Sequence, residues 1–360
     1  MRSFVRFLSV MLILSLVLAG CGGGKSEKKG VAVSGESKTA ATTPAPVETK
    51  AGETAAAPAQ KEITVKLASS SRDALKHVMF NFNSFGKDQG VSLEWKQYKG
   101  GSKAAQALLA REVDVAVLQT EHVMGDTSGE LRMIALLTQG PGNVLLVDSK
   151  YKDQIKSVKD LQGKKVGVSS TGSGTHQFLL ALLDRRGIDP SSINVLPKGL
   201  IAPKIFAEGE VVATVTIEPY ASQVIKSGAA FALVDTRRAE GIQEVYGVDA
   251  LGWIALVTRA DVLEERGPEM ARLTEAVQQS LRRIASEDIE ALVADSPDYM
   301  FPDGDRDLYA KMLEQNRSVF VADGKVTEKL LGPVWADMQA KGAVPKDKSL
   351  DLSQFVASAK

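Results

Sequence analysis

The chain has 360 residues, with 44 basic and 44 acidic side chains and a formal net charge of zero. This balance gives no electrostatic basis for binding nucleic acid or for a polybasic membrane patch. A single cysteine excludes an internal disulfide and a cysteine-rich metal site. The length is ample for a hydrophobic core.

The first 20 residues have the layout of a secretory signal. Arg2 and Arg6 form a positive start, and residues 7–18 form an apolar run. The stretch Leu18-Ala19-Gly20-Cys21 resembles a bacterial lipoprotein box, which implies cleavage before Cys21 and lipidation of its thiol. The apolar run has about twelve residues, fewer than the ~20 that span a bilayer, so we expect a lipid anchor and not a transmembrane helix.

Residues 22–60 are rich in Gly, Ser, Thr, Ala, Lys, Glu and Pro, and apart from alanine their only apolar side chains are three valines. Such a segment cannot bury enough surface to offset the entropy of ordering it. We expect a disordered tether between the membrane and a folded body that begins near Lys61.

From Lys61 onward, the spacing of apolar residues predicts two successive strand–helix–strand–helix–strand units. The expected strands of the first unit are residues 63–67, 91–95 and 113–118, and its helices are residues 72–85 and 103–110. The second unit has expected strands at 164–169, 192–196 and 210–217, with helices at 175–186 and 202–207. Alternating elements at this spacing favour parallel sheets with right-handed crossovers.

Two such units predict an α/β protein with two lobes, each a mostly parallel sheet flanked by helices. Apolar runs at 133–139, 143–148 and 251–258 are the expected crossings. Lobe 1 is then discontinuous, with residues 61–139 and 251–360, and lobe 2 comprises residues 140–250. An apolar stripe in residues 270–284, followed by helices at 306–316 and 327–339, predicts a helical tail that covers the sheet of lobe 1.

In open α/β sheets, ligands bind beyond the carboxyl ends of the strands, where helix N-termini present unpaired backbone N–H groups. The residues at these positions form a short polar set, which we predict to bind a small solute between the lobes: Ser70, Ser71, Arg72, Gly101, Ser102, Thr120, Thr171, Ser173, Gly174, Thr175 and Glu218. For each hydroxyl, the alternative is an ordinary helix N-cap.

Two charged members of this set have alternatives of their own. Glu218 suits an amine or amide N–H of the solute, or else it is a first-turn helix acid beside Pro219. Arg72 suits an anion, or else it is a solvated helix residue. We predict no metal and no cofactor.

Motifs for catalysis or nucleotide binding are absent. The stretch from Gly172 to Gln177 has glutamine where a dinucleotide fingerprint needs its third glycine, and no phosphate-loop lysine is present. No His-Glu-x-x-His or Gly-x-Ser-x-Gly motif occurs. A pair of Ser173 and His176 is the one arrangement that leaves a surface hydrolase open. We therefore expect no enzyme.

Residues 157–258 resemble the periplasmic solute-binding proteins of ABC importers in the nitrate/sulfonate/taurine and thiamine-precursor group (NMT1/THI5-like and SsuA-like). The matching stretches are Val158 to Val168, Thr171 to His176, Leu182 to Pro190, Glu218-Pro219, Asp235 to Arg237 and Val245 to Gly247.

The resemblance implies a two-lobed periplasmic-binding-protein fold of type II that closes on one small, anionic or zwitterionic organic solute. It also implies delivery to a membrane permease with its ATPase, in the periplasm or at the cell exterior, by a monomer that binds no nucleic acid. A ligand-sensing lipoprotein that presents its closed form to a receptor shares these features and remains an alternative.

Overall fold

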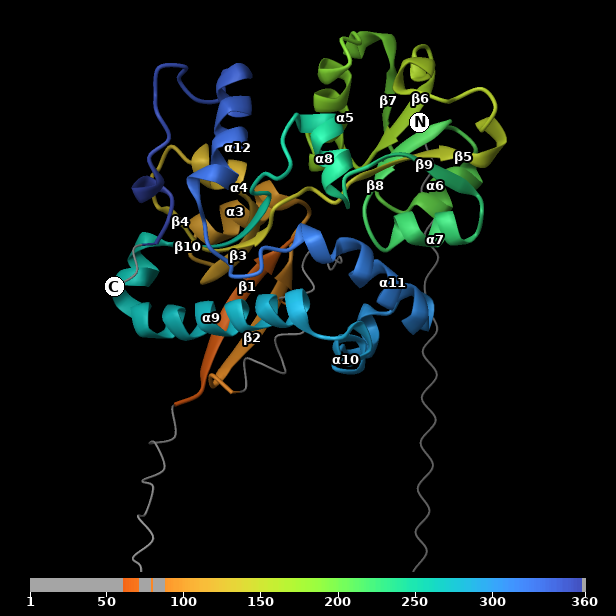
Figure 1. The fold of residues 1–360 in the computed structure, drawn as a ribbon. Helices are drawn as coiled ribbons and strands as arrows, with labels where there is room; N and C mark the ends of the chain where they lie inside the picture. Colours follow the sequence, from red (N-terminus) through yellow and green to blue (C-terminus); the bar gives the residue numbers. More distant parts are fainter. Residues whose placement is uncertain (1–60, 71–78, 80–87, 358–360) are drawn as a thin grey trace, which may run out of the picture. The chain divides into compact units, whose positions relative to one another are not determined.

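The structure, a computed structural model, describes residues 61–70, 79 and 88–357 (Figure 1). Several expectations concern residues outside this description: the signal, Cys21, the tether at 22–60, Ser71 and Arg72. Of the expected helix 72–85, only Met79 is described. The described residues form one compact unit.

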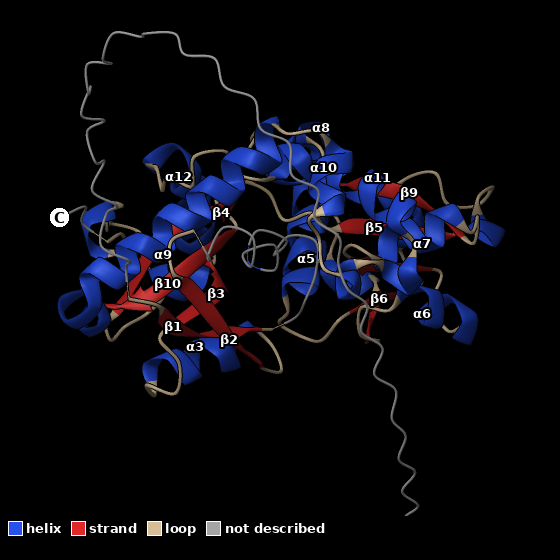
Figure 2. Cartoon of the chain, turned by 90° about the horizontal axis from the view of Figure 1, so that it is seen from below, coloured by secondary structure: helices blue, strands red, loops and turns tan. Residues whose placement is uncertain are grey.

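Two five-stranded sheets, each flanked by helices, build this unit (Figure 2). The first has the order β2-β1-β3-β10-β4, with bounds Val91–Gln97, Ile63–Ser69, Val115–Gln119, Ile254–Arg259 and Leu131–Thr138. The second has the order β7-β6-β8-β5-β9, with bounds Asn194–Pro197, Lys165–Val168, Ala213–Thr216, Val144–Asp148 and Ala230–Asp235.

Both sheets follow the same topology. In the first, β1 pairs in parallel with β2 and β3, and β10 is antiparallel to β3 and β4. In the second, β6 pairs in parallel with β7 and β8, and β5 is antiparallel to β8 and β9. The expected α/β class with mostly parallel sheets is confirmed. Each sheet is mixed, because it contains one antiparallel strand, β10 in the first and β5 in the second.

Helices cover both faces of each sheet. Those of the first sheet are α3 (Gly101–Leu109), α4 (Thr120–Met124), α9 (Ala260–Ser286) and α12 (Glu328–Ala340). Those of the second are α5 (Gly174–Arg185), α6 (Ala202–Glu208), α7 (Tyr220–Lys226) and α8 (Ala239–Tyr246).

Strand β5 shows why its apolar run is continuous. Leu145 and Val147 belong to the core under α5, while Val144 and Leu146 belong to a second core with α6 and α7. Alternate residues of a strand point to opposite faces, so a strand covered on both faces must be apolar throughout. The same reasoning explains β3, in which residues 115–118 are all buried.

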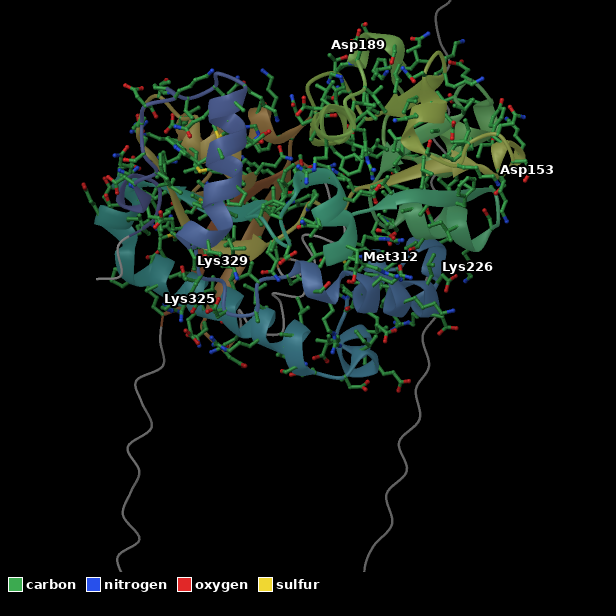
Figure 3. All side chains as sticks on the ribbon, turned by 45° about the horizontal axis from the view of Figure 1, so that its top comes forward. Asp153, Asp189, Lys226, Met312, Lys325 and Lys329 are labelled. Atoms are coloured by element: carbon green, nitrogen blue, oxygen red, sulfur yellow. The ribbon has the colours of Figure 1, made fainter. Side chains whose placement is uncertain are left out.

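The C-terminal tail departs in part from expectation. Helix α9 packs on β4 and β10, and α12 packs on α4, as predicted for a tail that covers the first sheet. However, α11 (Arg306–Asn316), which follows α10 (Ile289–Ala294), contacts α7 of the second sheet. Lys226 of α7, labelled in Figure 3, pairs with Asp305, which directly precedes α11. The tail therefore touches both sheets, and the predicted lobe boundaries stay a prediction.

Several strands are shorter than expected; β8, expected at 210–217, spans only Ala213–Thr216, and the starts of β10 and β7 each have a specific cause. Strand β10 begins at Ile254 and not at Leu251, because Gly252 donates its N–H to Leu330 O instead of joining the ladder. Strand β7 begins at Asn194, because Asp189 caps a short 3₁₀ turn at Pro190–Ser192.

Candidate functional site

The loop between β6 and α5 gathers three hydroxyl groups. Ser169 Oγ lies 2.8 Å from Ser173 Oγ and 2.9 Å from Thr175 Oγ1, and the last two lie 3.0 Å apart. The backbone N–H of Ser169 also donates to Thr175 Oγ1, at 2.9 Å. Ser173 is the N-cap of α5 and accepts from the N–H of His176, as Ser favours at this position.

This cluster begins a twelve-residue helix. The first turn of a helix has N–H groups without intrahelical partners and the positive end of the helix dipole. Thr171 and Gly172, just before it, are exposed, and Gly172 takes a positive φ of 77° that lets the loop turn. The predicted Thr171, Ser173, Gly174 and Thr175 therefore lie together, at a place suited to an oxyanion.

The same loop argues against a hydrolase. His176 Nδ1 accepts from the N–H of Gly172, at 3.0 Å, and Ser173 Oγ donates to Ser170 O, at 2.7 Å. The imidazole nitrogen that faces the loop is therefore engaged by backbone and the hydroxyl proton is directed at a carbonyl. Neither contact is the nucleophile–base hydrogen bond that such an enzyme needs.

The start of α5 abuts the end of β3. A Cβ placed on Gly174 would lie 2.6 Å from Gln119 Nε2 and 3.8 Å from Trp253 Cζ2. Gln119 ends β3 and Trp253 directly precedes β10, so both belong to the first sheet. Only glycine fits at position 174 without moving the Gln119 amide.

Gln119 and Trp253 were missed by the sequence analysis. A signal for Gln119 existed, because it is the first polar residue after a continuous buried strand. Trp253 had none, because its apolar neighbours made it part of an expected strand. Its ring packs against Tyr246 of α8 in a tilted arrangement, with centroids 6.2 Å apart and an interplanar angle of 53°.

The predicted residues of the first sheet have different surroundings. Thr120 is 1% exposed and its hydroxyl donates to Gly252 O, at 2.8 Å. Ser102 is exposed at the start of α3. The carbonyl of Ser70 accepts from Gln97 Nε2, at 3.4 Å, which links the ends of β1 and β2.

Gly101 packs against His122 of α4, since a Cβ there would lie 2.7 Å from His122 Nε2. Burial lowers the pKa of His122, which favours the neutral imidazole. Burial raises the pKa of the neighbouring Glu121, with a smaller opposing effect from Lys341. This edge of the first sheet therefore carries uncharged groups, the amide of Gln119 and the imidazole of His122.

Glu218 does not join these residues. It is 2% exposed, and its carboxylate accepts from Ser222 N at 3.0 Å, Ser222 Oγ at 2.7 Å and Arg237 Nη1 at 2.5 Å. Arg237 also forms a bidentate pair with Asp235, at 2.8 and 2.6 Å, and donates to Gln315 Oε1 of α11, at 2.9 Å. Glu218 precedes Pro219, which is the N-cap of α7, so it is not the first-turn acid of the alternative; its carboxylate accepts from the N–H of Ser222 in the first turn and pairs with Arg237.

Other classes of site find no support in the described part of the chain. No group of three or more metal-ligating side chains occurs there. None of the helices in this part is long and apolar enough to cross a membrane.

Comparisons with known proteins place this geometry in context. The profile of a family described as NMT1/THI5 like matches residues 83–291, more than half of the chain. The taurine-binding periplasmic protein of Escherichia coli (strain K12) is 29% identical over 131 residues, which are 33% of this chain and 38% of that relative. The match thus spans well under two thirds of the length of that relative.

Two solved structures share the fold. The periplasmic aliphatic sulphonate binding protein SsuA from Escherichia coli has a TM-score of 0.61 and 19% identity, over 82% of this chain and 98% of that chain. A Candida albicans protein with the generic periplasmic binding protein structural fold has a TM-score of 0.60 and 16% identity, over 82% and 96%. The predicted periplasmic-binding-protein fold is confirmed.

Proposed function

Because the chain belongs to the NMT1/THI5-like family, whose relatives above are binding proteins and not enzymes, we propose that it is the solute-binding component of an ABC importer. The solute is a small anionic or zwitterionic organic molecule, of the sulfonate, taurine, nitrate or thiamine-precursor kind. On the outer side of the membrane, the protein closes on the solute and delivers it to the permease, which works with its ATPase.

One observation supports this proposal above the others. The hydroxyl cluster at the start of α5, which belongs to the second sheet, lies against Gln119 and Trp253 of the first sheet. The helix N–H groups and the Gln119 amide can together bind a sulfonate or carboxylate without a cationic side chain. Trp253, which is 6% exposed, belongs to the core of the first sheet next to Gly174.

The solute would be identified by a thermal-shift panel on the full chain, unfolded and refolded beforehand to remove any bound solute. The panel contains nitrate, alkanesulfonates, taurine, aromatic carboxylates and aminopyrimidines. A ligand at ~100 times its Kd adds about 2.7 kcal/mol of stability, which raises the Tm by roughly 4 °C for a unit of this size. A refolded protein that responds to none of these classes would contradict the proposed solutes.

We further propose that the protein is anchored by lipid on Cys21, with residues 22–60 as the tether. Replacing Cys21 with Ser should shift the protein from the membrane fraction to the soluble exported fraction and remove the acyl mass from the N-terminal peptide. Retention of the Cys21→Ser variant in the membrane fraction would contradict this proposal.

A further inference from the structure

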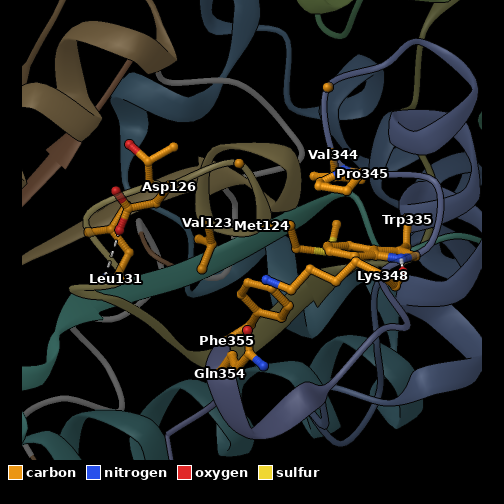
Figure 4. Close-up of a pocket in the computed structure, with 14 residues that line it drawn as sticks. Val123, Met124, Asp126, Leu131, Trp335, Val344, Pro345, Lys348, Gln354 and Phe355 are labelled. Carbon is orange, nitrogen blue, oxygen red and sulfur yellow. Dashed lines mark hydrogen bonds between the residues drawn. The ribbon is translucent and has the colours of Figure 1, made fainter.

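A cavity of about 370 Å³ lies beside the first sheet, away from the candidate site (Figure 4). The end of α4, the loop that leads into β4, helix α12 and the C-terminal segment enclose it. None of the predicted ligand-binding residues lines it. Its volume is within the range of small-molecule sites.

Two aromatic side chains form one part of the wall of this cavity. Trp335 of α12 and Phe355 of the C-terminal segment pack with their ring centroids 5.7 Å apart. Met124, at the end of α4, lies beside them (Figure 4). These three side chains are 5%, 7% and 4% exposed, so the core that surrounds them fixes their positions.

The rim contributes one cation. Gln339 Nε2 donates to the carbonyls of Pro345 and Lys348, at 3.1 and 2.8 Å, and Trp335 Nε1 donates to Lys348 O, at 3.0 Å. These bonds fix the backbone of Lys348. Figure 4 shows its side chain running across the cavity between Trp335 and Phe355.

The carboxylates around the cavity are engaged elsewhere. Asp126 closes its own loop by accepting from Ser128 Oγ, at 2.7 Å, and from the N–H of Leu131, at 3.2 Å. Asp351 accepts from Ser353 Oγ and Gln354 Nε2, at 2.7 and 2.9 Å. These hydrogen bonds lower the pKa of Asp351, and the nearby charge of Lys348 adds to this effect, although no carboxylate in the described part of the chain forms an ion pair with Lys348.

We propose that this cavity is a second small-molecule site, which takes an aromatic carboxylate. The ring of the ligand packs against Trp335 and Phe355, and its carboxylate pairs with the ammonium group of Lys348. This site is separate from the solute site, because it shares no lining residue with it.

The test is ligand-observed NMR on the full chain, with phenylacetate as the probe and phenylacetamide as its uncharged analogue. We expect phenylacetate to bind with a millimolar or lower Kd and to be weakened about fivefold in Lys348→Met, since the cation is partly exposed. The matched control is Lys346→Met, an exposed neighbour that does not line the cavity, which should bind as the parent does. Phenylacetamide should bind at least fivefold more weakly.

Ala343→Leu separates this site from the solute site. Ala343 lines the cavity and is exposed, so a larger side chain fills the cavity without disturbing the core. We expect the variant to lose phenylacetate binding and to keep the thermal shift with the solute from the panel above. Phenylacetate binding that survives Ala343→Leu, or that is equal in Lys348→Met and Lys346→Met, would overturn the proposal.

Discussion

Arg237 and Glu218 are buried charges that neutralise each other at the carboxyl edge of the second sheet. They are 4% and 2% exposed, and Asp235 and Ser222 satisfy their remaining polar atoms. Burial of an ion pair costs desolvation energy, which complete hydrogen bonding offsets. This network therefore stabilises the loop that leads into α7, and its contact with Gln315 extends it to α11.

Breaking this pair should destabilise the fold. Arg237→Met leaves Glu218 as an uncompensated buried charge, so we expect a loss of about 3–5 kcal/mol in urea unfolding. Adding Glu218→Gln to this variant should restore part of the loss. Lys226→Met, which breaks the exposed pair with Asp305, is the control and should cost at most about 1 kcal/mol. Equal losses in the two single variants would contradict this account.

His122 makes stability depend on pH. Its folded-state pKa is lowered by burial, so below pH ~6.5 the unfolded chain binds a proton that the folded protein does not. Stability should then fall as the pH decreases from ~6.5 toward the folded pKa, by at most about 1.4 kcal/mol per pH unit.

The measurement is urea unfolding of the parent and of His122→Gln between pH 7.5 and 5. His122→Gln should lose the part of the pH dependence of the unfolding free energy that comes from His122. Glu121 acts in the opposite direction, because its raised pKa favours the folded protein as the pH falls, but it is common to both proteins. Parallel pH profiles would show that His122 titrates alike in the folded and unfolded chains.

At the scale of elements, the start of α5 combines a stable cap with a tight contact. Ser173 caps the helix, and Gly174 allows the Gln119 amide to approach. Gly174→Ala favours the helix by propensity but displaces Gln119 from the candidate site. We therefore expect a Tm within a few degrees of the parent and at least a tenfold loss of affinity for the solute.

The matched control for that substitution is Gly332→Ala in α12, where a new Cβ meets nothing within 4 Å. It should leave solute affinity unchanged. If Gly174→Ala also binds the solute with the affinity of the parent, the start of α5 does not form part of the solute site.

At the scale of the whole molecule, the two sheets are linked by more than the chain crossings. Ile242 of α8, a helix that follows β9 of the second sheet, belongs to the core of the first sheet. Tyr246 packs against the cores of both sheets. Together with the contact of α11 on α7, these packings join the sheets through shared side chains.

This arrangement predicts cooperative unfolding. All three tryptophans, at positions 95, 253 and 335, belong to the first sheet or to the segments around it, whereas far-UV circular dichroism reports on both sheets. The urea midpoints from tryptophan fluorescence and from circular dichroism should coincide within error. A dichroism transition that precedes the fluorescence transition would mean that the second sheet unfolds separately.

The sequence predicted most strands and helices of the two repeated units because their signals are local, but it did not predict α7 (Tyr220–Lys226), β9 (Ala230–Asp235) or α8 (Ala239–Tyr246). Continuous apolar runs marked the buried strands β3 and β5, and Gly187 with Pro190 marked the end of α5. The boundaries of β10 and β7 were wrong because a hydrogen bond from Gly252 to Leu330 and a cap at Asp189 decide where pairing begins. The spacing of apolar residues along the sequence does not reveal such hydrogen bonds.

The candidate site was predictable only in part. Position at the end of a strand and before a helix identified Thr171, Ser173, Gly174 and Thr175, which lie together, because this rule depends on neighbours in sequence. The same rule selected Glu218, whose carboxylate is instead engaged by Arg237, 19 residues away.

By itself, the sequence determined the α/β class, the repeated unit and the hydroxyl-rich start of α5, because hydrophobic periodicity and capping are properties of neighbouring residues. Only the tertiary structure decided which polar groups face one another. In the tertiary structure, Gln119 and Trp253 lie next to Gly174, and Glu218 pairs with Arg237. A cavity lies between α4 and the C-terminal segment. These outcomes depend on contacts between residues far apart in the chain, which follow from the packing of the sheets and helices.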